Sequence, residues 1–284
     1  MSKVVELFSF PVRDKSLNWD NIIGNQYCPY TKKKCFKVRK SEPEISIGTC
    51  VVEYGKNSEN IIICPHRLLQ NNQIFLDCIH LLTLHQPGNE LHIVPEVAIP
   101  GGNVDYFLVS SDENRKVVDF VGIELQTMDT TGTVWPERQM ALYDLDVISE
   151  KPNIAKTFGM NWKMTAKTTL VQLHHKIDTF QALNKHLVLV VQDPLLDYIK
   201  KEFSFSHISC PSRLGDSMQF HSYSYSYVIS DKLFKIKLNQ RYSTDSAGVS
   251  SLLGLNAAAN IDLKEIISIL ESKLTDSTML LIGG

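Results

Sequence analysis

The hydrophobic period of the chain changes twice between residues 92 and 192, and this restricts the folds that the chain can adopt. Three runs, HIVPEVAI, VDYFLVSS and KVVDFVGIELQTMD, are typical of strands, and SSDEN between the last two is typical of a turn. A helical segment follows, and the apolar run HLVLVVQD after it is typical of a strand buried on both faces. This order predicts a mixed α/β (α+β) fold in which helices flank one mixed sheet.

The helical segment carries one apolar stripe and has Thr165 as its expected N-cap. It lies in the connection from Gln126 to His186, so we expect the two strands that it joins to be parallel, with a right-handed crossover. A short helix PLLDYIKKEF, an alternating strand HSYSYSYVISD and an amphipathic terminal helix DLKEIISILESKL complete the expected elements. The residues of the stripe, at spacings of three and four, are Ala166, Leu170, Leu173, Ile177 and Phe180.

Composition excludes several classes of protein. The chain has 284 residues and a net charge of −2, so it is not a bulk polycation, and contact with nucleic acid needs a local basic patch. The first residues, MSKVVELFSF, lack a sustained apolar run, and no stretch approaches the ~18 apolar residues of a membrane span. We therefore expect no signal peptide and no membrane contact, and six cysteines in such a chain suggest a reducing cytoplasm.

Residues 1–90 show no regular period, and we expect them to be irregular. They contain the basic run TKKKCFKVRK, which is typical either of a solvated loop or of a nucleic-acid contact. Cys28 and Cys35 are separated by six residues, and Cys50 and Cys64 by thirteen. Neither gap is the short C-x-x-C spacing of many metal sites, so buried free thiols and a four-thiolate metal site both remain open.

Acidic residues stand on strands where a half-buried strand normally avoids them. Side chains alternate along a strand, so Glu124 and Gln126 point the same way while Leu125 points into the core. If the neighbouring strand is adjacent, Asp105 can converge with Glu124, and the two carboxylates would suit Mg²⁺, with the Leu125 carbonyl as another oxygen ligand. The alternative is that both acids are solvent-facing strand residues.

Three stretches resemble the NotI family of type II restriction endonucleases. GNVDYFLVS followed by VGIELQ resembles the PD-(D/E)xK nuclease signature, with Gln126 in place of the lysine. The two longer and more specific stretches are GTCVVEYGKNSENIIICPHRLL and NWKMTAKTTLVQLHHKIDTFQALNKHLVLVVQD. The resemblance covers roughly residues 25 to 200.

The resemblance implies a restriction-endonuclease-like mixed sheet in a homodimeric, Mg²⁺-dependent enzyme that cuts both strands of double-stranded DNA and leaves 5′-phosphates. It places Asp105, Glu124 and Gln126 in catalytic positions. It also implies one structural zinc or iron, held by Cys28, Cys35, Cys50 and Cys64. The change of pattern near residue 90 divides the chain into an N-terminal region with these cysteines, residues 1–90, and a nuclease core, residues 91–284. Cys78 and Cys210 lie outside this four-cysteine pattern, and we expect both to be core thiols.

Further candidates depend on position alone. Glu96 is either another acid near the site or a surface residue at a strand end. Arg138 and Gln139 follow the catalytic strand and are candidates for base contacts, because arginine pairs with guanine and glutamine with adenine. Lys163 and Lys167, near the start of the long helix, are candidates for phosphate contacts.

Two rival functions share these features. The first is a DNA-binding protein that does not cut, with Gln126 as the lesion, because a neutral glutamine orients groups only by hydrogen bonding. The second is a structure-selective repair nuclease with the same core fold, which would cut branched or damaged DNA instead of a sequence.

Overall fold

A six-stranded mixed sheet forms the centre of the protein. The computed structural model describes residues 2–153, 157–255, 267–268 and 271–272. The sheet has the order β16-β15-β14-β11-β10-β9, and its first three strands along the chain form an antiparallel meander. These strands are β9 (Glu90–Ile99), β10 (Gly102–Ser111) and β11 (Val117–Gln126). All three strand predictions are confirmed.

The other half of the sheet contains the predicted parallel pair. β14 (His186–Gln192) is parallel both to β11 and to β15 (Met218–Val228), and β16 (Leu233–Thr244) returns antiparallel to β15. Every residue of β14 is buried, because alternate side chains face opposite layers of the protein. Leu187 and Leu189 belong to one core cluster, and Val188 and Val190 to another. The mixed α+β architecture is therefore confirmed.

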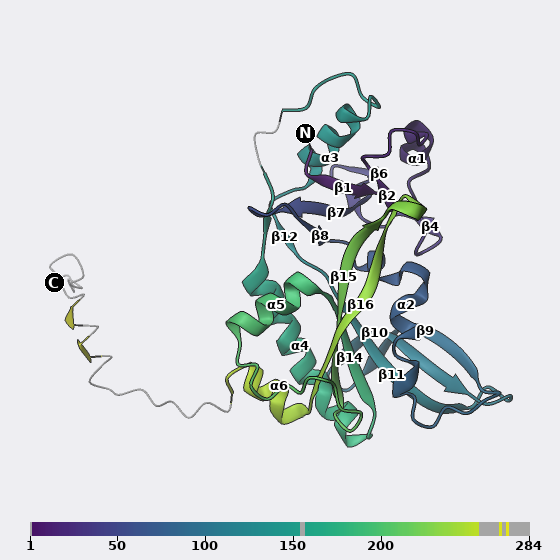
Figure 1. Cartoon of the computed structure of the whole chain (residues 1–284), viewed down its shortest axis with the longest axis vertical. Coiled ribbons are helices and arrows are strands. Elements are labelled where there is room, and N and C mark those ends of the chain that lie inside the picture. The colour runs from purple at the N-terminus through teal and green to yellow at the C-terminus, as the bar shows by residue number, and fades with distance from the viewer. Residues whose placement is uncertain (1, 154–156, 256–266, 269–270, 273–284) are drawn as a thin grey trace, which may run out of the picture.

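Helices cover both faces of this sheet (Figure 1). α4 (Trp162–Ala182), α5 (Asp193–Glu202) and α6 (Ser246–Leu252) lie together on one face, and α2 (Gln73–Leu76) lies on the other. The predicted apolar stripe of α4 is buried throughout. Short 3₁₀ segments accompany these helices: η1 (Pro65–Asn72), η2 (Ile79–Leu81) and η3 (Ile229–Asp231).

The start of α4 differs from the prediction. Asn161, not Thr165, is the N-cap, and its backbone N–H donates to the Asp129 carbonyl at 2.9 Å. Thr165 lies one turn inside the helix, where its hydroxyl donates to the Asp129 carboxylate at 3.1 Å. The helix therefore begins earlier because the residues after β11 anchor its first turn. The expected terminal helix, residues 262–274, lies almost wholly outside the described residues.

A second sheet shows that the prediction of an irregular N-terminal region was wrong. β2 (Phe10–Pro11), β1 (Val4–Leu7), β7 (Thr49–Tyr54) and β8 (Glu59–Ile62) form an antiparallel sheet in that order. The strands are short and interrupted by long connections, so they give little periodic signal. The same region contains α1 (Trp19–Asn25) and two small ribbons, β3 (Tyr27–Cys28) with β4 (Lys33–Lys34) and β5 (Val38–Arg39) with β6 (Glu42–Ser46).

The segment after β11 also holds a helix that the hydrophobic pattern did not predict. α3 (Trp135–Asp144) has Pro136 in its first turn and buries both Glu137 and Arg138. Because charged residues occupy buried positions, the sequence of this helix lacks a clear apolar stripe. The chain just before β1 explains part of this burial, since the Lys3 N–H donates to the Glu137 carboxylate at 2.9 Å. β12 (Thr130–Thr131) and β13 (Gly159–Met160) pair on either side of α3.

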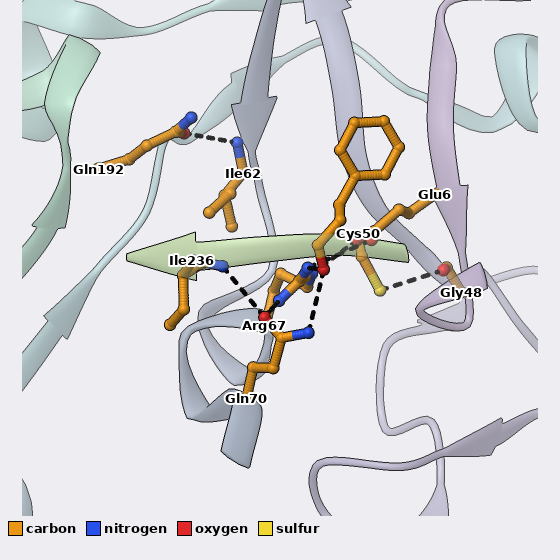
Figure 2. A network of polar contacts seen from close by, with 9 residues as sticks. Glu6, Gly48, Cys50, Ile62, Arg67, Gln70, Gln192 and Ile236 are labelled. Carbon is orange, nitrogen blue, oxygen red and sulfur yellow. Dashed lines mark hydrogen bonds and ion pairs between the residues drawn. The ribbon is translucent and has the colours of Figure 1, made fainter. Parts of the chain in front are cut away.

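Buried polar contacts join the N-terminal sheet to the central sheet. Figure 2 shows Arg67 beside Glu6, and the Arg67 Nε donates to the Glu6 carboxylate at 2.7 Å with both side chains buried. Arg67 also donates to the Phe234 carbonyl on β16 at 2.8 Å. The Gln192 side chain accepts from the Ile62 N–H at 2.8 Å. The boundary at residue 90 remains a prediction. Within the described part of the chain, none of the helices has the length and apolarity needed to span a bilayer.

Candidate active site

A polar pocket of about 220 Å³ lies where β10 begins, β11 ends and α4 passes over both. The three residues of the nuclease signature, Asp105, Glu124 and Gln126, all line it. Tyr106 pairs with Ile123 in the β10–β11 ladder, so the adjacent residues Asp105 and Glu124 lie side by side at its end. The remaining residues around the pocket are Asn103, Leu125, Thr169, Gln172, Leu173, Lys176 and Leu189.

The backbone of β11 holds Asp105 in place. The Asp105 Oδ2 accepts a hydrogen bond from the Leu125 N–H at 2.8 Å. This contact fixes the carboxylate against the strand that carries Glu124 and Gln126. The sequence-based expectation that the two strands are adjacent is thereby confirmed.

Glu124 is a buried carboxyl group with an opposite charge beside it. The Lys176 Nζ on α4 donates to the Glu124 Oε1 at 2.6 Å, with side-chain exposures of 7% and 11%. Burial raises the pKa of Glu124 to about 7, the negative charge of Asp105 also raises it, and the Lys176 ammonium acts in the opposite direction. Two acids that repel each other in a polar pocket would gain from a cation between them.

Gln126 completes the signature without a charge. Its Nε2 donates to the Thr127 carbonyl at 2.7 Å, which turns the amide nitrogen toward the chain itself. The position that carries lysine in the general signature therefore supplies only hydrogen bonds in this chain.

α4 contributes three polar side chains to this pocket that the sequence did not point to. Thr169, Gln172 and Lys176 line the pocket from the helix, at spacings of three and four. A polar stripe at helical spacing, directly beside an apolar stripe, was the signal that could have found them. Asn103, which precedes Asp105 by two residues on β10, was missed as well.

Glu96 does not line this pocket. It is exposed on β9, where its φ of 53° interrupts the regular strand. The pairs on either side of it, Val97 with Val104 and Pro95 with Tyr106, place it across from Asp105 on the edge of the sheet. Glu96 therefore lies on the exposed edge of the sheet, across from Asp105 and outside the lining of the polar pocket.

The four residues expected to contact DNA lie in different environments. Lys163 and Lys167 are exposed on the first turns of α4. Arg138 is buried, and its guanidinium donates to the carbonyls of Ile47 at 2.7 Å and Ser46 at 3.2 Å. The Arg138 guanidinium also donates to the Gln139 side-chain oxygen at 2.8 Å, so both candidates for base contact are hydrogen-bonded within the protein. This placement argues against base contact by Arg138 in this conformation.

The four N-terminal cysteines line one small pocket but do not form a recognisable metal centre. Cys28, Cys35, Cys50 and Cys64 are all buried around it. In the described residues, no three side chains of His, Cys, Asp or Glu are arranged to hold one metal ion. A hydrogen bond between the Cys50 and Cys64 thiols lowers the pKa of Cys64 to about 7 and raises that of Cys50.

The two other cysteines differ from each other. Cys78 is fully buried, as expected, and its Sγ lies 3.7 Å from the His221 Nδ1. Cys210 is exposed, so the prediction that it is a core thiol was wrong. It lies outside the regular elements, in the connection between α5 and β15, where no strand or helix face directs it into the core.

Comparison with protein families gives one match. The family model "Restriction endonuclease NotI" matches residues 25–212, which is about two thirds of the chain. This range contains the four N-terminal cysteines and every residue that lines the polar pocket. No curated protein matches the sequence. The chain therefore belongs to the NotI restriction endonuclease family and is a site-specific deoxyribonuclease.

Proposed function

We propose that this restriction endonuclease cuts both strands of double-stranded DNA at a short specific sequence, with Mg²⁺ as cofactor and a 5′-phosphate on each product end. The observation that carries this proposal is the convergence of Asp105 and Glu124 on one polar pocket. Family membership supports the enzyme class, and the pocket supports the chemistry.

The donor atoms of the pocket fit Mg²⁺. Asp105 and Glu124 would hold the ion, and the carbonyl of Leu125 is a further oxygen candidate, which is the ligand chemistry that Mg²⁺ prefers. The raised pKa of Glu124 supports this assignment, because a bound cation would relieve the repulsion from Asp105. When bound, such an ion activates a water molecule and stabilises charge on the phosphate.

DNA would approach along the exposed start of α4. Lys163 and Lys167 are exposed there, and residues further along the same helix line the pocket. Phosphate contacts at these lysines would position the duplex over Asp105 and Glu124. Each chain has one such pocket for one strand, so a two-fold symmetric homodimer would place two pockets on the two strands. Light scattering of the DNA complex tests this assembly: a monomer that cuts both strands in one binding event would contradict it.

The cysteine pocket would hold one structural zinc or iron. Interactions with Cys50 and with the backbone of His66 lower the pKa of the Cys64 thiol to about 7, whereas burial raises the pKa of the Cys35 thiol. A metal ion would favour the thiolate form at all four cysteines, and four thiolates suit tetrahedral zinc or iron. Elemental analysis of the purified protein should find about one metal ion per chain. A metal-free protein that is folded and active would show that these cysteines are simply buried.

Digestion of a DNA of known sequence, with and without Mg²⁺, tests the function. We expect discrete fragments only when Mg²⁺ is present, and sequencing of their ends gives the recognition site and the terminal phosphate. Binding without cleavage would instead support a DNA-binding protein that does not cut. Cleavage restricted to branched or damaged DNA would support a repair nuclease.

A further inference from the structure

The candidate active site has one positive charge, and it comes from a helix. Among the described residues that line the polar pocket, Lys176 alone is cationic. Its Nζ lies 2.6 Å from the Glu124 carboxylate, and its side chain is almost fully buried. Gln126, on the strand, is neutral and has its amide nitrogen bonded to the Thr127 carbonyl. The positive charge that Gln126 does not supply from β11 is therefore supplied to the same pocket by Lys176 from α4.

The fold brings α4 unusually close to the strands at this point. A Cβ on Gly101 would lie 2.0 Å from the His175 carbonyl oxygen, and one on Gly102 would lie 3.3 Å from the Lys176 Cε. The Thr179 hydroxyl donates to the Pro100 carbonyl at 3.0 Å. The β9–β10 turn thus contacts the helix directly on both sides of Lys176, and this contact directs its side chain toward Glu124.

A second ion pair, between a partly buried lysine and a buried carboxylate, shows the contacts of a lysine with a structural role. At the opposite end of β11, the Lys185 Nζ lies 2.6 Å from Asp119. Asp119 also accepts hydrogen bonds from the backbone N–H groups of Leu84 and Phe120, so its carboxylate is fully satisfied within the protein. Glu124, in the described structure, accepts a side-chain hydrogen bond from Lys176 alone and faces an open pocket.

We propose that Lys176 is a catalytic residue whose ammonium contacts the scissile phosphate, in place of the lysine that Gln126 replaces on the strand. This proposal rests on the proposed nuclease function. In the free enzyme Lys176 is bonded to Glu124, and the arriving phosphate would take over one of its three N–H donors.

The positive charge has a defined task in the reaction. In hydrolysis, the oxygen of water forms a bond to phosphorus while the bond from phosphorus to O3′ breaks. Water loses one proton to solvent, and O3′ gains one from solvent. Negative charge on the non-bridging oxygens is greatest in the transition state of this displacement. An ammonium fixed beside these oxygens in a buried site stabilises that charge.

Cleavage by Lys176→Gln, compared with wild type at saturating Mg²⁺ and DNA, tests the proposal. We expect a loss of rate on the order of 10²-fold or more, which is typical for removal of one group that stabilises transition-state charge. Lys185→Gln is the matched control, because it removes a partly buried lysine from an ion pair of equal length whose buried acid lies on the same strand as Glu124, without touching the pocket. It should cut at the wild-type rate while losing some thermal stability.

Two further measurements separate a catalytic lysine from a structural one. Without Mg²⁺, Lys176→Gln should bind DNA less tightly, and the dependence of its affinity on salt should become shallower by about one phosphate contact. Lys185→Gln should leave both unchanged. In addition, the double variant Gln126→Lys/Lys176→Gln should recover at least tenfold in rate over Lys176→Gln, because the charge returns from the strand.

The outcomes distinguish this proposal from the function on which it rests. A wild-type protein that cuts no DNA would contradict the proposed function itself. If wild type cuts, the proposal is overturned by a folded Lys176→Gln variant within threefold of the wild-type rate, or by a loss of rate that excess Mg²⁺ removes. Lack of any recovery in the double variant would also overturn it. If Lys176→Gln does not fold, Lys176→Met replaces it in the comparison of cleavage rates, because a buried methionine needs no polar partner.

Discussion

At the scale of single residues, the proposed activity depends on two carboxylates that share one pocket. The Leu125 N–H fixes the Asp105 carboxylate by a hydrogen bond. Glu124 is buried, and both Asp105 and Lys176 affect its pKa. Their chemistry is set by these neighbours and not by the strand that carries them. The consequence is a site whose charge changes near neutral pH.

Affinity for Mg²⁺ should rise steeply with pH. The pKa of Glu124 is raised to about 7, so its carboxyl is mainly protonated at pH 6 and mainly ionised at pH 8. A proton and Mg²⁺ compete for the same oxygens, and the metal therefore binds more tightly as pH rises through 7, by about tenfold at most per unit below that pKa. Calorimetric titration of the protein with Mg²⁺ at several pH values measures this. Glu124→Gln should bind weakly with no such dependence, and a flat wild-type profile would contradict the assignment.

At the scale of elements, the contact between α4 and the β9–β10 turn positions the pocket. Gly101 has a φ of 96° and no room for a side chain against the His175 carbonyl. A substitution at this glycine would move the helix away from the turn and would draw Lys176 away from Glu124 with it.

Gly101→Ala should therefore lower both stability and cleavage. We expect a loss of about 1–3 kcal/mol in the free energy of unfolding from overpacking, added to the strain of alanine at positive φ. Gly88→Ala is the control, because Gly88 has nearly the same φ, 97°, with no atom near its missing Cβ. Urea unfolding and cleavage rates measure the pair. Equal effects of the two substitutions would show that the helix does not need this close contact.

The elements with a clear local period were predictable from sequence. The meander of β9, β10 and β11, the helix α4 and the doubly buried strand β14 each carry their own hydrophobic pattern. Strand alternation brought Asp105 and Glu124 together, and the resemblance to NotI endonucleases favoured their catalytic interpretation. α3 was missed because its buried Glu137 and Arg138 imitate an exposed surface. The N-terminal sheet was missed because its strands are short.

The part of the site that sequence could not give depends on long-range contacts. Lys176 and Glu124 are 52 residues apart, and only the packing of α4 on the β9–β10 turn brings them together. Likewise, threonine is a common N-cap residue, so Thr165 was the expected cap. The hydrogen bond from the Asn161 N–H to the Asp129 carbonyl instead anchors the start of the helix at Asn161. Tertiary contacts of this kind override local preference.

At the scale of the whole molecule, a buried ion pair joins the region around the cysteines to the nuclease sheet. Arg67 follows Cys64 by three residues and pairs with Glu6 on β1 (Figure 2). Its guanidinium also donates to the Phe234 carbonyl on β16. This arrangement makes the N-terminal sheet and the central sheet depend on each other for stability.

Arg67→Met should destabilise the protein by about 3–5 kcal/mol, because it leaves the Glu6 carboxylate buried without an opposite charge beside it. The double variant Glu6→Gln/Arg67→Met should recover much of this loss, since no buried charge remains. Urea unfolding of both variants gives the comparison. Lys235→Met, which removes an exposed ion pair with Asp231, should leave the unfolding midpoint unchanged. A loss for Arg67→Met no larger than for Lys235→Met would contradict this role.

The most direct measurement of the central claim is the cleavage rate of Asp105→Ala and Glu124→Ala on a DNA that the wild-type protein cuts with Mg²⁺. Each substitution removes one proposed metal ligand from the pocket, so we expect cleavage to fall by on the order of 10²-fold or more. The unfolding midpoint and the affinity for the same DNA should stay close to wild type. Cleavage within tenfold of wild type in both folded variants would contradict the assignment of the active site.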